Sequence, residues 1–326
     1  MSTYLLTNRV PRRGSFTQQP TADGSVTVLR SEAPRARTLG QFERITARAA
    51  IAGMLSEAKA QATGAHSPML VVFIHGFNND VDSALASVAD IGDGLQTHGL
   101  RPVMACFSWP SDGQLWEYLS DQGDAQRSVP AVMRLLAYLD RARDPRLCEV
   151  NVHVVAHSMG NFLLREGLAA FARRLGYPAK QPYLTEVAMV AADVDADTLA
   201  QGGSGFGITS LARRVTAYYS RHDNTLSVSR YAKHWGSARL GRNGPADWSR
   251  LPPNVVAVDC TEVVKPIASN VLQMTADELF KVHSSYWQNA RWLRDLAQTF
   301  TSVDRAVVDT RRSRPDVHAA SYALVP

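Results

Sequence analysis

The alternation of short apolar runs with longer amphipathic stretches constrains the fold of this chain most. It occurs three times in succession, with residues 69–77 leading to 81–99, 101–109 to 128–142, and 150–158 to 160–176. A strand followed by a helix, repeated three times, requires right-handed crossovers and so places parallel strands side by side. Helices then cover both faces of such a sheet.

Further apolar runs at 185–195, 214–223 and 254–263 continue the pattern, and a helix is expected over 283–300. Residues 4–10 and 24–30 resemble two more strands, which we expect to form an antiparallel edge, and 41–62 reads as a helix. The pattern predicts an α/β domain with a doubly wound, mostly parallel sheet of about eight strands.

We expect three parts along the 326 residues: edge strands and a helix at 1–65, a catalytic domain at 66–305, and a tail at 306–326. The glycine-rich stretch 201–213 predicts a mobile loop near the strand ends. Arg311, Arg312 and Arg314 form the densest basic run, which we interpret as part of a solvated tail and not as a nucleic-acid grip.

Composition narrows the possible partners and cofactors. No apolar stretch approaches the roughly 18 residues of a membrane helix, so we expect a soluble, cytoplasmic protein with no membrane segment. The three cysteines are far apart and lack CxxC spacing, which indicates neither a disulfide framework nor a thiolate metal site. Nucleotide motifs and HExxH are absent, so we predict no cofactor and no catalytic metal.

The stretch AHSMG places Ser158 between an expected strand and an expected helix. Small residues at Ala156 and Gly160 permit the tight turn that lifts a nucleophilic hydroxyl clear of the sheet. Helix capping by the same hydroxyl is the alternative interpretation. The turn also directs the helix N-terminus toward a developing oxyanion.

The stretch FIHGFNN, after an earlier strand, has the form of an oxyanion loop. Phe77 N–H and Met159 N–H are the expected donors, and Gly76 permits the close approach. His75 is expected to hold the loop through local hydrogen bonds. Asn78 and Trp109 are the candidate substrate-binding residues, although Trp109 could equally be an aromatic ring packed beneath a rigid turn.

A serine nucleophile needs a histidine base and an acid to orient it, in the chain order Ser, acid, His. Of the nine histidines, His283 follows the last expected strand and is the predicted base, ahead of His222 and His234. Asp223 ends the next-to-last strand and is the predicted acid. The alternative acids, Asp193 and Asp195, lie one strand earlier.

Together these motifs resemble the α/β-hydrolase superfamily over residues 69–300. The set LLTNR, HGFNN, FSWPSDG, AHSMGN, YYSRHD, RLGRNG and HSSY is similar to a bacterial subfamily of α/β hydrolases classified as a domain of unknown function. The resemblance implies a serine-hydrolase fold with Ser158, Asp223 and His283 as its triad. It implies little about the substrate.

The expected function is therefore a hydrolase that cleaves small-molecule carboxylic esters through an acyl-serine. The same triad could instead transfer the acyl group or cleave an amide. A binding protein that has lost catalysis is an alternative of another class, which an apparently complete triad disfavours. The oligomeric state is not predicted.

Overall fold

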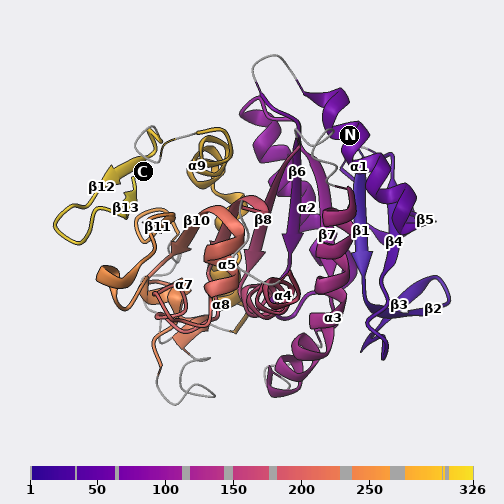
Figure 1. Cartoon of the computed structure of the whole chain (residues 1–326), viewed down its shortest axis with the longest axis horizontal. Coiled ribbons are helices and arrows are strands. Elements are labelled where there is room, and N and C mark those ends of the chain that lie inside the picture. The colour runs from indigo at the N-terminus through magenta and orange to yellow at the C-terminus, as the bar shows by residue number, and fades with distance from the viewer. Residues whose placement is uncertain are drawn as a thin grey trace.

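The computed structural model describes residues 2–33, 35–62, 66–111, 118–142, 150–175, 182–227, 237–264, 276–302, 304 and 308–325. Within these ranges an eleven-stranded sheet crosses the whole molecule (Figure 1). Its spatial order is β12 (Arg311–Ser313), β13 (Ser321–Leu324), β11 (Val255–Asp259), β10 (Ala212–Tyr219), β9 (Leu184–Val190), β8 (Asn151–His157), β6 (Met69–Ile74), β7 (Val103–Ser108), β1 (Thr3–Thr7), β4 (Thr27–Ser31) and β5 (Glu43–Ile45).

The strands from β13 to β1 in this order are all parallel to their neighbours. Antiparallel pairing is found where β4 and β5 follow β1 and where β12 joins β13. The predicted doubly wound, mostly parallel fold is confirmed, with more strands than expected. The two N-terminal strands pair antiparallel as expected, β1 with β4. They do not form the edge of the sheet, because β1 also pairs in parallel with β7 and β5 lies outside β4.

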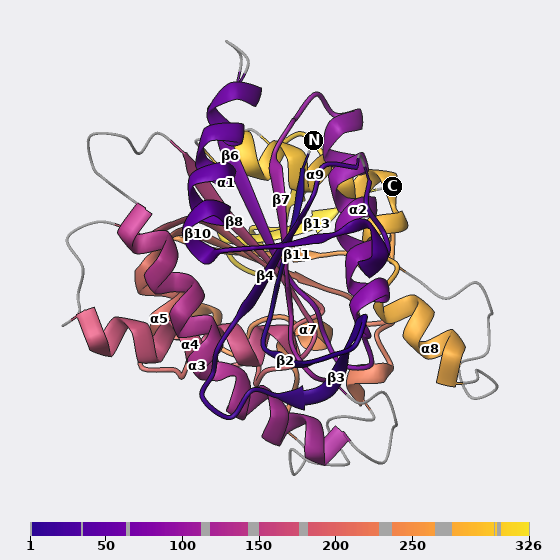
Figure 2. The same cartoon turned by 90° about the vertical axis from the view of Figure 1, so that its right-hand side faces the viewer.

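Alternate residues of each strand enter two separate cores, as a twofold strand period requires. In β6, for example, Leu70, Val72 and Ile74 face one core, whereas Val71 and Phe73 face the other. The first face is covered by α1 (Ala47–Gln61), α3 (Tyr118–Ala142), α4 (Gly160–Leu175) and α5 (Phe206–Leu211). The second is covered by α2 (Val81–Thr97) and α9 (Ala290–Thr301), and Figure 2 shows the two layers on opposite sides of the sheet.

Several helix boundaries differ from expectation. The helix expected over 41–62 begins only at Ala47, because Thr46 accepts a hydrogen bond from Ala49 N–H as its N-cap. The residues before it, Glu43–Ile45, extend along β4 as β5. The helix expected from Ser128 begins at Tyr118, so part of the expected polar loop is helical.

The segment expected as one helix over 283–300 is divided. The helix α8 (Ala276–His283) ends at the predicted base, and a 3-10 turn, η5 (Tyr286–Gln288), separates it from α9. The Asn289 side chain accepts hydrogen bonds from Arg291 and Trp292 N–H and so starts a new helix. The division leaves His283 at a helix end, where its ring can turn toward the sheet.

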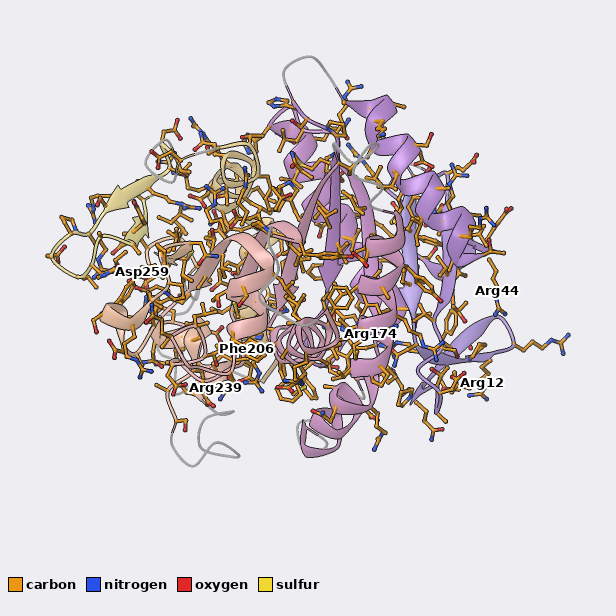
Figure 3. All side chains as sticks on the ribbon, viewed as in Figure 1. Arg12, Arg44, Arg174, Phe206, Arg239 and Asp259 are labelled. Atoms are coloured by element: carbon orange, nitrogen blue, oxygen red, sulfur yellow. The ribbon has the colours of Figure 1, made fainter. Side chains whose placement is uncertain are left out.

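The expectation of a loop throughout 201–213 is wrong for its second half, which forms α5 and the start of β10. Close packing requires two glycines of the first half: a Cβ at Gly203 would lie 2.6 Å from Asp197 O, and a Cβ at Gly205 would lie 2.7 Å from Thr198 O. Phe206 on α5 is exposed at the surface (Figure 3).

The expectation of a solvated C-terminal tail is also wrong. The strand β13 pairs with β11 inside the sheet, and β12 pairs with β13. The Arg311 guanidinium is buried against the Asp295 carboxylate, whereas Arg312 is exposed. A separate two-stranded sheet, β2 (Arg9–Arg12) with β3 (Ser15–Pro20), follows β1.

Candidate active site

Ser158 occupies the turn between β8 and α4 with a φ of +51°, in the left-handed region that non-glycine residues seldom adopt. Its N–H donates to Val190 O at 3.0 Å, and its carbonyl accepts from Asp193 N–H at 3.2 Å. The Asn161 side-chain amide donates to Ala156 O at 2.8 Å and to Ser158 O at 3.2 Å. These bonds hold a strained turn, and strain of this kind clusters at functional sites.

Two glycines let this turn touch the loop after β6. A Cβ at Gly160 would lie 2.6 Å from both Ile74 O and His75 O, and a Cβ at Gly76 would lie 2.7 Å from Ser158 Cβ. Neither position has room for a side chain. The close approach predicted for Gly76 is present, and Gly160, predicted to permit the tight turn, also packs against the backbone of this loop.

The predicted base and acid are in direct contact. His283 Nδ1 and Asp223 Oδ2 are 2.6 Å apart, and both side chains are almost fully buried. Asp223 follows β10, and its second carboxylate oxygen accepts from Leu226 N–H at 3.3 Å. Burial alone would lower the pKa of His283, but the charge and hydrogen bond of Asp223 outweigh it, so the pKa lies above its ordinary 6.5.

His157, which the sequence analysis gave no role, connects the serine turn to the base. Its Nε2 lies 3.0 Å from His283 O, and the two imidazole rings are 4.7 Å apart. Burial, with the His283 charge second, holds the pKa of His157 well below 6.5. The ring is therefore neutral, and because a carbonyl can only accept, Nε2–H donates to His283 O. The one sequence signal was its position next to Ser158.

The alternative acids bind an arginine. Arg239, which precedes α7 (Leu240–Asn243), donates from Nε to Asp193 Oδ1 at 2.8 Å and from Nη1 to Asp195 Oδ1 at 2.6 Å. Its guanidinium is buried, and Figure 3 labels the residue. Asp193 still lies close enough to add to the raised pKa of His283.

The loop from His75 to Asp80 contains the expected oxyanion donor. Phe77 in this loop is buried, and its ring centroid lies 6.1 Å from that of Phe280. Across the described residues, no backbone carbonyl accepts from the N–H of Met159, the other expected donor. Asn78 is exposed with a φ of +55°.

His75 and Trp109 form a buried unit beneath this loop. The rings stack at 5.4 Å, Trp109 Nε1–H donates to His75 O at 2.8 Å, and Trp109 N–H donates to His75 Nε2 at 3.0 Å. Because Nε2 accepts, Nδ1–H donates to Gly76 O, and the expectation that His75 holds the loop by local hydrogen bonds is confirmed. Trp109 has no exposed surface, so its place as a pocket wall stays a prediction.

The sequence offered two histidines, His222 and His234, as alternative bases. Among the described residues, His222 makes no side-chain hydrogen bond with Asp223; it is half-buried, with its backbone N–H bonded to Ser220 Oγ. His234 lies outside the described residues. The described chain contains no group of three His, Cys, Asp or Glu side chains able to hold a metal ion. Nor, in the same ranges, is any helix long and apolar enough to cross a membrane.

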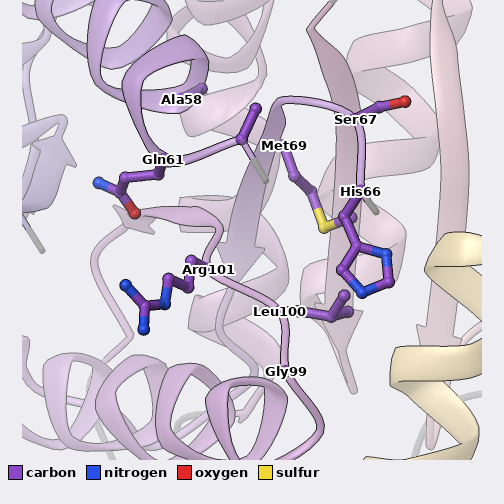
Figure 4. Close-up of a pocket in the computed structure, with 9 residues that line it drawn as sticks. Ala58, Gln61, His66, Ser67, Met69, Gly99, Leu100 and Arg101 are labelled. Atoms are coloured by element: carbon purple, nitrogen blue, oxygen red, sulfur yellow. The ribbon is translucent and has the colours of Figure 1, made fainter. Parts of the chain in front are cut away.

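The pocket in Figure 4 lies at the amino ends of the parallel strands, opposite the end that contains Ser158. It is lined by residues at the end of α1 and the start of β6, including Gln61, His66 and Met69. Ser158 follows the last residue of β8, which runs parallel to β6. Six residues of strand span about 20 Å, so this pocket is not part of the serine site.

The sheet, its helices and the strand–serine–helix turn define an α/β hydrolase. Residues 56–272 match the model of a family described as alpha/beta hydrolase of unknown function (DUF900), and the chain belongs to this family. The uncharacterized protein alr1448 of Nostoc sp. (strain PCC 7120 / SAG 25.82 / UTEX 2576) is 24% identical over 209 residues. That match covers 49% of this chain and 53% of alr1448, so the chain matches about half the length of this curated relative.

The solved structures that match this chain are more distant in sequence. Phospholipase PlaB from Legionella pneumophila in complex with thio-NAD is 14% identical with a TM-score of 0.31, over 65% of this chain and 40% of that protein. EstE5-PMSF is 11% identical with a TM-score of 0.35, over 86% of this chain and 84% of that protein. A Trichoderma reesei cutinase in complex with a phosphonate inhibitor is 13% identical with a TM-score of 0.30, over 78% of this chain and 86% of that protein.

Proposed function

We propose that this protein is a serine hydrolase that cleaves small-molecule carboxylic esters, with residues 66–305 as its catalytic domain. The observation that carries the proposal is the buried contact of 2.6 Å between His283 Nδ1 and Asp223 Oδ2, joined through His157 to the strained turn at Ser158. A buried imidazole that a carboxylate orients, next to a serine in a strained strand-to-helix turn, is the arrangement that activates a hydroxyl.

The reaction follows from the proton positions. Since Nδ1–H of His283 donates to Asp223, its Nε2 has a free lone pair to accept the Ser158 hydroxyl proton. The serine oxygen then bonds to the ester carbonyl carbon, and the carbonyl electrons move onto oxygen. Phe77 and Met159 N–H donate to this oxyanion. As the carbonyl reforms, the alcohol leaves with the proton from His283.

Water completes the cycle. His283 takes a proton from a water molecule, the resulting hydroxide attacks the acyl-serine, and the carboxylic acid leaves as Ser158 recovers its proton. Asn78, exposed beside Phe77, would contact the acyl group, and Trp109 would support the pocket wall from below. These steps use protein groups and water alone.

Labelling with a fluorophosphonate probe and hydrolysis of p-nitrophenyl esters of increasing acyl length test the proposal. The wild type should label and turn over, and Ser158→Ala should lose both, because the probe and the ester react with the same oxygen. Ser313→Ala, at an exposed serine on β12, is the matched control and should retain both. Labelling that persists in Ser158→Ala would overturn the proposal.

A further inference from the structure

The LLTNR stretch places Arg9 at the edge of the sheet that contains the serine turn. The preceding strand, β1, runs parallel to β7 with Thr7 opposite Ser108, and Arg9, two residues later, is the first residue of β2. The strands β6, β7 and β8 end at this same edge, where parallel sheets place their sites. Although it carries a charge, Arg9 is only 1% exposed.

The guanidinium of Arg9 binds the backbone of the oxyanion loop. Its Nη2 donates to Asn79 O at 2.6 Å, and its Nε donates to Ser108 Oγ at 3.1 Å. The Asn79 side-chain amide in turn donates to Phe77 O at 2.8 Å, and Asn79 N–H donates to Ser111 Oγ at 3.1 Å. A continuous set of hydrogen bonds thus runs from Arg9 to the residue whose N–H is the expected oxyanion donor.

The charge of Arg9 also reaches this loop. Burial and, second to it, the Arg9 charge lower the pKa of His75 to about 3, so the His75 imidazole stays neutral. The same charge helps to lower the pKa of Asp80, after the hydrogen bonds from Ser83, against the opposing effect of burial. In surroundings shielded from water, a fixed positive charge stabilises a nearby negative charge more than it would in bulk solvent.

We propose that Arg9 is a positioning residue for the oxyanion loop, holding Phe77 N–H in place through Asn79 and favouring negative charge on the substrate oxygen. The inference rests on the proposed hydrolase function. It assigns a part in the chemistry to the β1–β2 segment, which lies before residues 56–272 that match the family. An arginine with a structural role alone would stabilise the fold, and its loss would not weaken binding of the transition state relative to binding of the ester.

Kinetics of Arg9→Lys and Arg9→Met on p-nitrophenyl butyrate, normalised to sites titrated with the fluorophosphonate, test this inference. Loss of a direct oxyanion donor costs about a hundredfold or more in kcat. We therefore expect kcat to fall about a hundredfold in Arg9→Met and about tenfold in Arg9→Lys, which keeps the charge but not the two-point hydrogen bonding. KM should change by less than about threefold, because the ground-state ester makes no oxyanion.

The affinity for a trifluoromethyl ketone inhibitor is a second, independent measurement, because the tetrahedral adduct of this ketone with serine carries the oxyanion. This affinity should fall by the same factor as kcat/KM in each variant. Ser108→Ala removes one acceptor of the guanidinium without touching the charge, and we expect a smaller loss in kcat with the same pattern. It also keeps the test decisive where Arg9→Met does not fold.

The matched control is Arg30→Met, which removes a half-buried arginine bonded to Glu57 at 2.7 Å near the opposite end of β1. It should lower thermal stability while leaving kcat per titrated site unchanged. Unchanged kcat per site in the Arg9 variants, or a rise in KM alone, would overturn the inference while the proposed function stands. A wild-type protein that neither labels nor hydrolyses esters would overturn the proposed function first.

Discussion

The imidazole of His283 is subject to opposing effects on its pKa. Burial favours the neutral ring, whereas the charge and hydrogen bond of Asp223, with a smaller contribution from Asp193, favour the protonated ring and prevail. A ring that is protonated cannot accept the serine proton. The pH at which activity appears therefore reports on the carboxylate that orients the ring.

For the wild type we expect kcat/KM to rise with pH through an apparent pKa above 6.5, because His283 must lose its proton to act as a base. Asp223→Asn removes the charge that raises this pKa, so its acid limb should move to lower pH. Its kcat should also fall, by about 10³- to 10⁴-fold, because the ring loses its orientation and tautomer. A pH–rate profile with p-nitrophenyl butyrate measures both effects.

Asp193→Asn and Asp195→Asn are the controls for this assignment, since both carboxylates bind Arg239. We expect each to retain kcat within about tenfold of wild type, since the His283–Asp223 contact survives. Wild-type activity in Asp223→Asn, or a greater loss in Asp193→Asn, would contradict Asp223 as the acid.

At the scale of elements, the last strands depend on a buried ion pair. Arg311 in β12 binds Asp295 of α9 through two nitrogens, from Nε to Oδ2 at 2.7 Å and from Nη2 to Oδ1 at 2.6 Å. Thr310 and Tyr218 hydroxyls donate to the same carboxylate, at 2.6 and 2.7 Å. This carboxylate joins α9, β10 and β12, so it fastens the C-terminal strands to the second face of the sheet.

Arg311→Met should lower the free energy of unfolding by about 3–5 kcal/mol, because it leaves the Asp295 carboxylate buried without its cation. Urea denaturation monitored by circular dichroism measures the change. Arg312→Met, on the adjacent exposed position, should stay within about 0.5 kcal/mol of wild type. Equal stability of the two variants would show that the ion pair adds nothing to the attachment of β12.

At the scale of the molecule, the central sheet is built from both ends of the chain. The first strand, β1, covers β7, and the late strand β13 covers β11. The late helix α9 supplies Trp292 and Leu296 to the core on the second face. Residues 56–272, which match the family, therefore contain neither the partner of β7 nor the helix that covers part of this face.

We expect a fragment of residues 56–272 to lack a cooperative unfolding transition, because it exposes the hydrogen-bonding edges of β7 and β11 together with the apolar surface beneath α9. Thermal and urea denaturation of the fragment, beside the 326-residue chain, measure this. A cooperative transition with the midpoint of the full chain would show that the terminal strands are dispensable.

Local patterns predicted the central strands well, because an apolar run and its following turn lie within a few residues of each other. The strand ending at Ile74 and the turn at Ser158 are examples. The predictions were wrong where contacts between residues far apart in the sequence determine the structure. Arg311 was predicted in a solvated tail, but its guanidinium is buried against Asp295. Residues 43–45 were predicted as helix, but they pair with β4 as a strand.

The sequence by itself determined the strand–helix order, the serine at a strand-to-helix turn and the glycines that allow it, since each depends on backbone preferences of neighbouring residues. Only the tertiary structure decided which side chains meet. It pairs His283 with Asp223 and not with the rival acids Asp193 and Asp195, and it brings His157 to the His283 carbonyl and Arg9 to Asn79 across 70 residues. Such contacts arise when parallel strands bring their carboxyl ends to one edge, and no local pattern encodes their partners.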